Sequence, residues 1–393
     1  MSDRRMMYVG TEKGVVVLGE DGERWREERT TLPGKLIETL VASAETGTLY
    51  AGLSHDGVYM STDGARSWDR VFTGDVRGVA VDPSNPATVY AGTEPVHLYR
   101  SQDSGDSWSE IEGLQRLPEK VRDEWWFPQP PHQGHVLSIF VDPRNGKRLY
   151  LAIEHGGVVH TEDGGATWED LSEGIEYLDI HQVGVDPSAE NLVYAATARG
   201  FYRSENYGKD WVLAQGGLTR DYFHDFIARP GASSTLYMTT ANGSPPSWIR
   251  PTRSESAVYC SNDNGVNWRQ LGGGLPPGER MMWNVTSDPL DDARLYAGGG
   301  DAPVAPQGGV KGGDVWMSLD RGDTWSRAFD SPLSWVHRGR CRLTNNWAGF
   351  VPDHRCRFAP RRCSTPSTYR PSRLHSRTRS SACISRCTGC APA

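Results

Sequence analysis

Residues 101–108 read SQDSGDSW, and five further segments repeat this pattern of Ser/Thr-x-Asp-x-Gly-x-x-Trp. They are STDGARSW (61–68), TEDGGATW (161–168), SENYGKDW (204–211), SNDNGVNW (261–268) and SLDRGDTW (318–325). A degenerate seventh copy, GEDGERW, occupies residues 19–25. Recurrence at intervals of 40 to 60 residues predicts a repeat architecture built from copies of one small unit.

Each position of this repeat has a mechanical explanation. The carboxylate accepts backbone N–H groups inside a tight turn, the Gly adopts a positive φ, and the Trp covers the apolar layer between sheets. Catalysis or metal binding is the alternative for the aspartates, but we interpret them as turn formers. The structural set is Asp63, Asp103, Asp163, Asn206, Asp263, Asp320, Trp68, Trp108, Trp168, Trp211, Trp268 and Trp325.

A second repeated phrase lies ahead of each turn. VAVDPSNPATVYAG (79–92) aligns without gaps with IFVDPRNGKRLYLA (139–152) and VGVDPSAENLVYAA (183–196), and each phrase predicts two strands joined by a polar turn. A third strand leads into the Asp-containing turn and a fourth follows the Trp. Four antiparallel strands per repeat are typical of a propeller blade. The sequence therefore predicts an all-β, seven-bladed β-propeller of four-stranded antiparallel blades.

The two chain ends are expected to share the first blade. Residues 6–18 read as a second and a third strand with no first strand before them, and SPLSWVHR (331–338) reads as a first strand without followers. We expect these segments to pair, because pairing removes exposed sheet edges.

The turn motifs resemble the Asp-box or BNR repeat, and the resemblance covers about residues 6–338. It implies a β-propeller similar to sialidase-like and glycosyl hydrolase BNR-repeat proteins, and to the photosystem assembly-factor propeller, which binds protein. Sialidases also carry Phe/Tyr-Arg-Ile-Pro ahead of the first Asp box. The nearest match here is Gln115-Arg116-Leu117-Pro118, which follows the third repeat, so no sialidase catalytic residues are carried over.

Two compositions meet near residue 338. The residues from there on contain twelve arginines, no lysine and a single acid, and they hold six of the seven cysteines. We therefore expect a propeller over 1–338 and an Arg/Cys/Ser-rich tail over 339–393, interpreted as disordered or out-of-frame sequence. The alternatives are a zinc site at Cys383, Cys387 and Cys390, or a basic arm for nucleic acid.

Composition also limits partners and location. The body before residue 338 is strongly acidic, which argues against nucleic acid as its partner. No apolar run is long enough for a signal peptide or a membrane span, so we expect a cytoplasmic monomer without membrane contact.

The long insertions indicate which face carries function. Segments 109–135, 240–257 and 299–314 all belong to the face opposite the Asp-box turns, and lengthened loops on a rigid scaffold commonly bind ligands. Histidines, acids and aromatic residues gather in the same parts of the sequence. The expected binding-face residues are His55, His97, Trp126, His135, Glu154, His155, His181, Arg199, Tyr222 and His224.

Two functions remain open. One is a binding propeller that presents this loop-rich face to a protein or a small ligand. The other is a glycoside hydrolase acting on a glycan, for which the candidate carboxylates are Glu94, Glu154, Asp225 and Asp301. We expect no cofactor and no metal, with a divalent ion held by several histidines and Glu154 as the alternative. Whether the chain is an enzyme stays open at this point.

Overall fold

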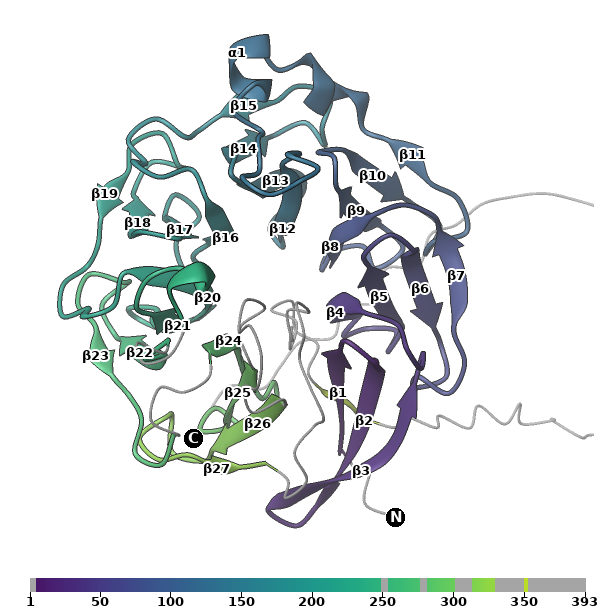
Figure 1. Ribbon diagram of the computed structural model, residues 1–393, viewed down its shortest axis with the longest axis vertical. Coiled ribbons are helices and arrows are strands. Elements are labelled where there is room, and N and C mark those ends of the chain that lie inside the picture. Colours follow the sequence, from purple (N-terminus) through teal and green to yellow (C-terminus); the bar gives the residue numbers. More distant parts are fainter. Residues whose placement is uncertain (1–4, 249–253, 276–280, 301–312, 329–349, 353–393) are drawn as a thin grey trace, which may run out of the picture. The chain divides into compact units, whose positions relative to one another are not determined.

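The computed structural model describes residues 5–248, 254–275, 281–300, 313–328 and 350–352. Its strands form seven four-stranded sheets that follow one another around a ring, with the first strand of each sheet toward the centre (Figure 1). The predicted all-β, seven-bladed propeller is confirmed. The described residues all belong to one compact unit, and the sequence from Asp353 on lies outside them.

Blades two to four occupy the first half of the chain. Blade two contains β4 (Ile37–Ala42), β5 (Leu49–Leu53), β6 (Gly57–Ser61) and β7 (Asp69–Phe72). Blade three contains β8 (Val76–Val81), β9 (Val89–Thr93), β10 (Leu98–Ser101) and β11 (Ser109–Glu110). Blade four contains β12 (His135–Asp142), β13 (Asn145–Glu154), β14 (Gly157–Thr161) and β15 (Glu169–Asp170).

Blades five to seven repeat the same order. Blade five contains β16 (Ile180–Val185), β17 (Val193–Thr197), β18 (Phe201–Ser204) and β19 (Val212–Leu213). Blade six contains β20 (Tyr222–Arg229), β21 (Thr235–Ala241), β22 (Ala257–Ser261) and β23 (Arg269–Gln270). Blade seven contains β24 (Met281–Ser287), β25 (Leu295–Gly300), β26 (Gly313–Ser318) and β27 (Ser326–Arg327).

Blade one is built from β1 (Arg5–Thr11), β2 (Gly14–Asp21) and β3 (Arg24–Thr31), with β28 (Phe350–Pro352) paired to β1. The segment predicted for that position, 331–338, lies outside the described residues. The strand beside β1 therefore comes from further along the chain, within the range that the sequence assigned to the tail. The unpaired backbone groups of β1 can accept any extended segment, so hydrophobic pattern alone does not select one.

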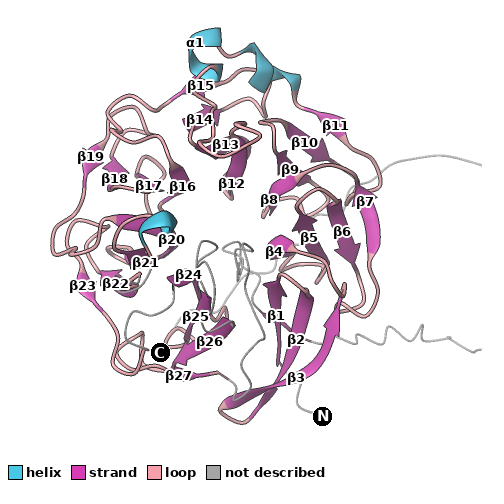
Figure 2. Ribbon diagram, in the orientation of Figure 1, coloured by secondary structure: helices cyan, strands magenta, loops and turns pink. Residues whose placement is uncertain are grey.

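Short helices occur only in the loop insertions of the described chain. The 3-10 helix η1 (Glu112–Arg116) and α1 (Glu119–Arg122) lie between blades three and four, and η2 (Pro245–Ser247) lies within blade six (Figure 2). None of these described helices has the length and apolar content needed to cross a membrane.

The Asp-box turn is held by a fixed set of hydrogen bonds. In blade three the hydroxyl of Ser101 donates to Asp103 at 2.7 Å and accepts the backbone N–H of Gly105 at 2.8 Å. The Asp103 carboxylate accepts the backbone N–H and the hydroxyl of Ser107. Bonds from the Ser107 hydroxyl and backbone N–H, with another from Ser101, lower the pKa of Asp103 to about 2. The structural role predicted for this aspartate fits these contacts.

The same bonds recur in the other turns, including the divergent one. Asn206 replaces the aspartate in blade five, and its side-chain oxygen accepts the backbone N–H of Asp210 at 2.9 Å. An amide oxygen thus takes the place of the carboxylate oxygen in this turn. The equivalent bonds in the remaining Asp-box turns are made by Asp63, Asp163, Asp263 and Asp320.

Each Trp of the repeat packs against the preceding blade. The Trp325 backbone N–H donates to Gly273 at 2.7 Å, and its ring lies in an apolar cluster with Leu271 and Tyr237 of blade six. Trp25 of blade one likewise donates to Ala328 at 2.8 Å and packs edge-on against Tyr296 of blade seven. The turn that ends one sheet therefore fixes its position on the sheet before it.

Replacing Ser101 with Ala tests this turn. The change leaves the buried N–H of Gly105 without its acceptor, so we expect the free energy of unfolding to fall by about 1–3 kcal/mol. Chemical denaturation measures the loss, with Ser109→Ala on the exposed outer strand as the control. Equal stability of the two variants would contradict the role assigned to the hydroxyl.

A second prediction concerns acid. Asp103 has a pKa of about 2 in the fold, below the unfolded value of about 3.9, so the unfolded state binds more protons between these values and stability falls as the pH falls through this window. Asp103→Asn keeps an acceptor in the turn, as Asn206 does in blade five, and removes the titration. We expect unfolding curves to lose less stability between about pH 4 and pH 2 in this variant than in the native protein. The exposed Asp106→Asn serves as the control, and an unchanged pH slope in Asp103→Asn would refute the prediction.

Candidate ligand-binding site

A β-bulge near the start of every first strand from β4 to β24 shapes the centre of the loop-rich face. In each of these blades the first strand has one extra residue that is not paired with the second strand. Such a bulge changes the direction in which the side chain of the extra residue points. The bulged residues are Glu38, Arg77, Leu137, His181, His224 and Trp283. The scaffold thus presents one such side chain at the equivalent strand position in each of blades two to seven.

Hydrogen bonds link these bulged residues from blade to blade. Nδ1 of His181 lies 2.6 Å from the carbonyl oxygen of Phe223, and Nδ1 of His224 lies 2.6 Å from that of Trp283. A carbonyl oxygen only accepts, so Nδ1 carries the proton in both rings. The Nε2 atom of each neutral ring is therefore the lone-pair nitrogen.

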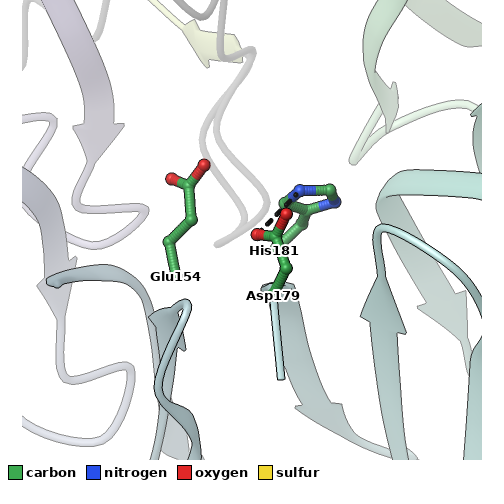
Figure 3. Close-up of side chains that lie close together, drawn as sticks. All are labelled: Glu154, Asp179 and His181. Atoms are coloured by element: carbon green, nitrogen blue, oxygen red, sulfur yellow. Dashed lines mark ion pairs between the residues drawn. The ribbon is translucent and has the colours of Figure 1, made fainter. Parts of the chain in front are cut away.

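Two carboxylates converge on His181. Glu154 ends β13, and Asp179 directly precedes β16 (Figure 3). One carboxylate oxygen of each acid and one ring nitrogen of His181 all lie within 4.8 Å of one another, and all three side chains are buried. Asp179 lies 3.4 Å from Nε2 of His181 and 3.3 Å from Nε2 of His155.

Ion pairs extend this cluster across the face toward blade two. Nε2 of His135 lies 2.6 Å from Glu154, and its Nδ1 lies 3.5 Å from Glu94. Glu94 in turn pairs with Arg77 at 2.7 Å. Arg77 also contacts Glu38 at 3.1 Å, so the network joins three blades beside the cluster.

Aromatic rings lie beside the same groups. Phe127, from the insertion between blades three and four, contacts the rings of His135 at 5.4 Å and His155 at 5.2 Å between centroids. Its neighbour Trp126 is stacked on His132 and is 53% exposed. The backbone N–H of Trp126 donates to His155 at 3.2 Å, so the insertion is anchored over blade four.

A second aromatic group continues the face toward blades six and seven. Tyr222 contacts His181 at 4.8 Å between ring centroids and Trp248 at 5.4 Å. Trp283 contacts both His224 and Trp248. On the other side, the Arg199 guanidinium lies 4.5 Å from the centroid of Tyr177.

The predicted binding residues divide into two sets. The structure brings most of them into this network: His135, Glu154, His155, His181, Tyr222 and His224 in the centre, Trp126 on the overlying loop and Arg199 over Tyr177. His97 instead pairs with Glu110 of the outermost strand at 2.6 Å, and His55 is 79% exposed beside Asp75. Asp75 pairs with Arg77 at 3.2 Å, so His55 lies at the exposed edge of the network, whereas His97 is bound to the outermost strand of blade three.

The four candidate carboxylates also separate. Glu154 lies in the cluster, and Glu94 is held by Arg77. Asp225 accepts the backbone N–H of Val285 at 3.0 Å, and Asp301 lies outside the described residues. Asp179 is the one member of the cluster that the sequence did not predict. The available signal was that Asp179 lies two residues before His181, just ahead of the repeated first-strand phrase that begins at Val183.

A separate cavity lies elsewhere among the described residues. Its volume is about 760 Å³, and its lining includes the turns between the first and second strands but no member of the Glu154 cluster. Prolines mark this mouth of the ring: Pro83, Pro143, Pro187, Pro230 and Pro289. Acids and arginines of the lining pair with one another, as Arg229 does with Asp292. We therefore place the candidate site at the cluster and not in the cavity.

The fold and this network define an Asp-box-type, seven-bladed β-propeller with a histidine–carboxylate cluster on its loop-rich face. A scan against models of known protein families gave no match. Xyloglucanase Xgh74A of Acetivibrio thermocellus is 23% identical over 233 residues, which make up 51% of this chain and 26% of that protein. The oligoxyloglucan-reducing end-specific xyloglucanase of Emericella nidulans is 22% identical over 226 residues, 51% of this chain and 25% of that protein.

Solved structures show the same fold. The GH74 xyloglucanase from Xanthomonas campestris superposes with a TM-score of 0.60 at 16% identity, covering 82% of this chain and 52% of that one. YCF48 from Cyanidioschyzon merolae superposes with a TM-score of 0.50 at 17% identity, covering 75% and 84%. The chain spans about a quarter of the length of the curated relatives it matches (26% and 25%). The expected likeness to glycosyl hydrolase propellers is thus found with xyloglucanases, and the sialidase-like part stays a prediction.

Arg77 offers a test of the network. Replacing it with Met leaves Glu38 and Glu94 without their shared cation, so we expect the free energy of unfolding to fall by about 3 kcal/mol. Adding Glu94→Gln to Arg77→Met removes one of the two carboxylates left without a cation. We expect the double variant to recover part of the lost free energy of unfolding. Chemical denaturation of the two single variants and the double variant gives the coupling energy, and strict additivity would contradict a shared network.

Proposed function

We propose that the loop-rich face binds a small polar ligand of the carbohydrate class. The observation that carries this proposal is the convergence of Glu154, Asp179 and His181 beneath an insertion that presents Trp126 and Phe127. Buried carboxylates and imidazoles supply directional hydrogen bonds, and aromatic rings supply flat apolar area. A few convergent polar groups beside aromatic side chains form the usual composition of a small-ligand site.

The chemistry of a sugar suits this arrangement. Each sugar ring offers hydroxyl groups to acceptors such as Asp179 and a patch of C–H groups to an aromatic face. The similarity in sequence to xyloglucanases supports the same ligand class, since those proteins are named for acting on a glycan. A protein ligand is the other form of the binding hypothesis, but the cluster is buried and suits groups small enough to reach it.

Glycoside hydrolysis is the second candidate function. The observation that favours it is the carboxylate pair of Glu154 and Asp179, whose oxygens approach within 4.8 Å. Retaining glycosidases place two carboxyl groups about 5 Å apart, one as nucleophile and one as acid and base. Under this hypothesis His135, which lies 2.6 Å from Glu154, orients one carboxylate and His155 the other.

Cytoplasmic location and a monomeric state remain predictions from the sequence.

Titration with xyloglucan oligosaccharides tests the binding proposal. Trp126→Ala and Phe127→Ala each remove aromatic area from the site, and we expect each to weaken binding about tenfold, which corresponds to about 1.4 kcal/mol. Isothermal titration calorimetry measures the affinities. Leu290→Ala is the matched control, because Leu290 is 66% exposed in a turn on the opposite face. Equal affinities for all three variants, or no binding by the native protein, would overturn the proposal.

Hydrolysis is tested separately by following release of reducing sugar from the same oligosaccharides. If the carboxylate pair is catalytic, Glu154→Gln and Asp179→Asn each lower turnover by at least about a hundredfold, while binding remains measurable. Binding without turnover by the native protein would eliminate the hydrolase and leave the binding propeller.

A further inference from the structure

We propose that Glu154, Asp179 and His181 form a binding site for one divalent transition-metal ion of the zinc or manganese type. One imidazole and two carboxylates make a mixed nitrogen and oxygen donor set, which suits these ions better than magnesium or calcium. The proposal goes beyond glycan binding, because uptake of the ion requires no sugar.

The hydrogen bonding of the two ring nitrogens of His181 is the first argument. Its Nδ1 donates to the carbonyl of Phe223 at 2.6 Å, so Nε2 is unprotonated in the neutral ring. That nitrogen is buried, makes no hydrogen bond within the described residues, and lies 3.4 Å from an oxygen of Asp179. A lone pair facing a carboxylate oxygen at this distance is repulsive without a cation or a proton between them.

The support around the ligands is the second argument. Metal-ligating histidines commonly donate their other N–H to a backbone carbonyl, and ligating carboxylates are commonly held by outer partners. His181 meets the first condition through Phe223. Asp179 lies beside His155 at 3.3 Å, and Glu154 lies beside His135 at 2.6 Å, so both carboxylates meet the second.

Distance and charge agree with the assignment. The three ligand atoms lie within 4.8 Å of one another. Metal–ligand bonds of about 2.1 Å place the ligand atoms of one zinc ion about 3–4 Å apart. Side-chain movements of about 1 Å therefore suffice to bring the three ligand atoms to these distances. Two buried carboxylates this close repel each other, and a divalent ion offsets that repulsion. Three protein ligands also leave at least one coordination position for water or a ligand group.

Calorimetric titration of the metal-stripped full chain with MnCl₂ and, separately, ZnCl₂ tests the site. The zinc titration uses a background in which all six tail cysteines are replaced with serine, so that the tail thiols do not contribute: Cys341, Cys356, Cys363, Cys383, Cys387 and Cys390. We expect one ion per chain in both titrations. Asp179→Asn and His181→Ala are each expected to weaken binding at least a hundredfold, whereas His97→Ala, which alters a histidine paired with the outermost strand of blade three, leaves it unchanged.

Thermal unfolding in the presence of the same ions gives an independent readout and shows that each variant is folded. The native chain and His97→Ala gain melting temperature with the ion because it binds the folded state. Asp179→Asn and His181→Ala unfold cooperatively but gain nothing. No stoichiometric uptake by the native chain, or equal uptake and equal stabilisation in Asp179→Asn and His181→Ala, overturns the site. Because these experiments contain no glycan, and glycan titrations are run with chelator, failure of either proposal is distinguishable from failure of the other.

Discussion

The propeller depends on an oxygen acceptor buried in a tight turn. In the described Asp-box turns a serine or threonine hydroxyl and an aspartate or asparagine oxygen bind the backbone N–H groups of the turn, as Ser101 and Asp103 do. The bonded turn then positions a tryptophan whose backbone or ring reaches the preceding blade, as at Trp325. The ring of sheets follows from a local bond that is repeated rather than from one large core.

Because the turns and tryptophans hold each blade in place, a bulge in a first strand changes where its side chain points. A bulge in a loose sheet would be absorbed by small movements, whereas here each first strand is fixed between two neighbours, and the extra residue has to point out of the register. The side chains at these positions range from acidic and basic to imidazole and aromatic, as Glu38, Arg77, His181 and Trp283 show. One repeated backbone irregularity thus presents a set of chemically different groups on the same face.

Sequence predicted the scaffold well because its signals are local: the spacing of Asp, Gly and Trp within eight residues specifies each turn. It also placed His135, Glu154 and His181 on one face, and the structure brings these three side chains close together. It did not predict that His97, which directly precedes β10, pairs with Glu110 of the outermost strand, because blade position does not reveal which way a side chain points. It missed Asp179, whose partners come from two blades, since contacts between distant segments leave no local pattern. The strand that pairs with β1 could not be predicted from the sequence either, because any short extended segment can pair with an open sheet edge.

The central claim is that bonds between blades fix the imidazole of His181 so that Nε2 faces the carboxylates of Asp179 and Glu154. NMR of isotope-labelled histidine in the metal-free protein at neutral pH reads the tautomer of each ring directly, with His181 assigned by the signal lost in His181→Ala. The structure predicts that Nδ1 of His181 carries a proton, which it donates to the carbonyl oxygen of Phe223. An Nε2–H tautomer would show that the ring serves Asp179 as a hydrogen-bond donor, and would contradict the account.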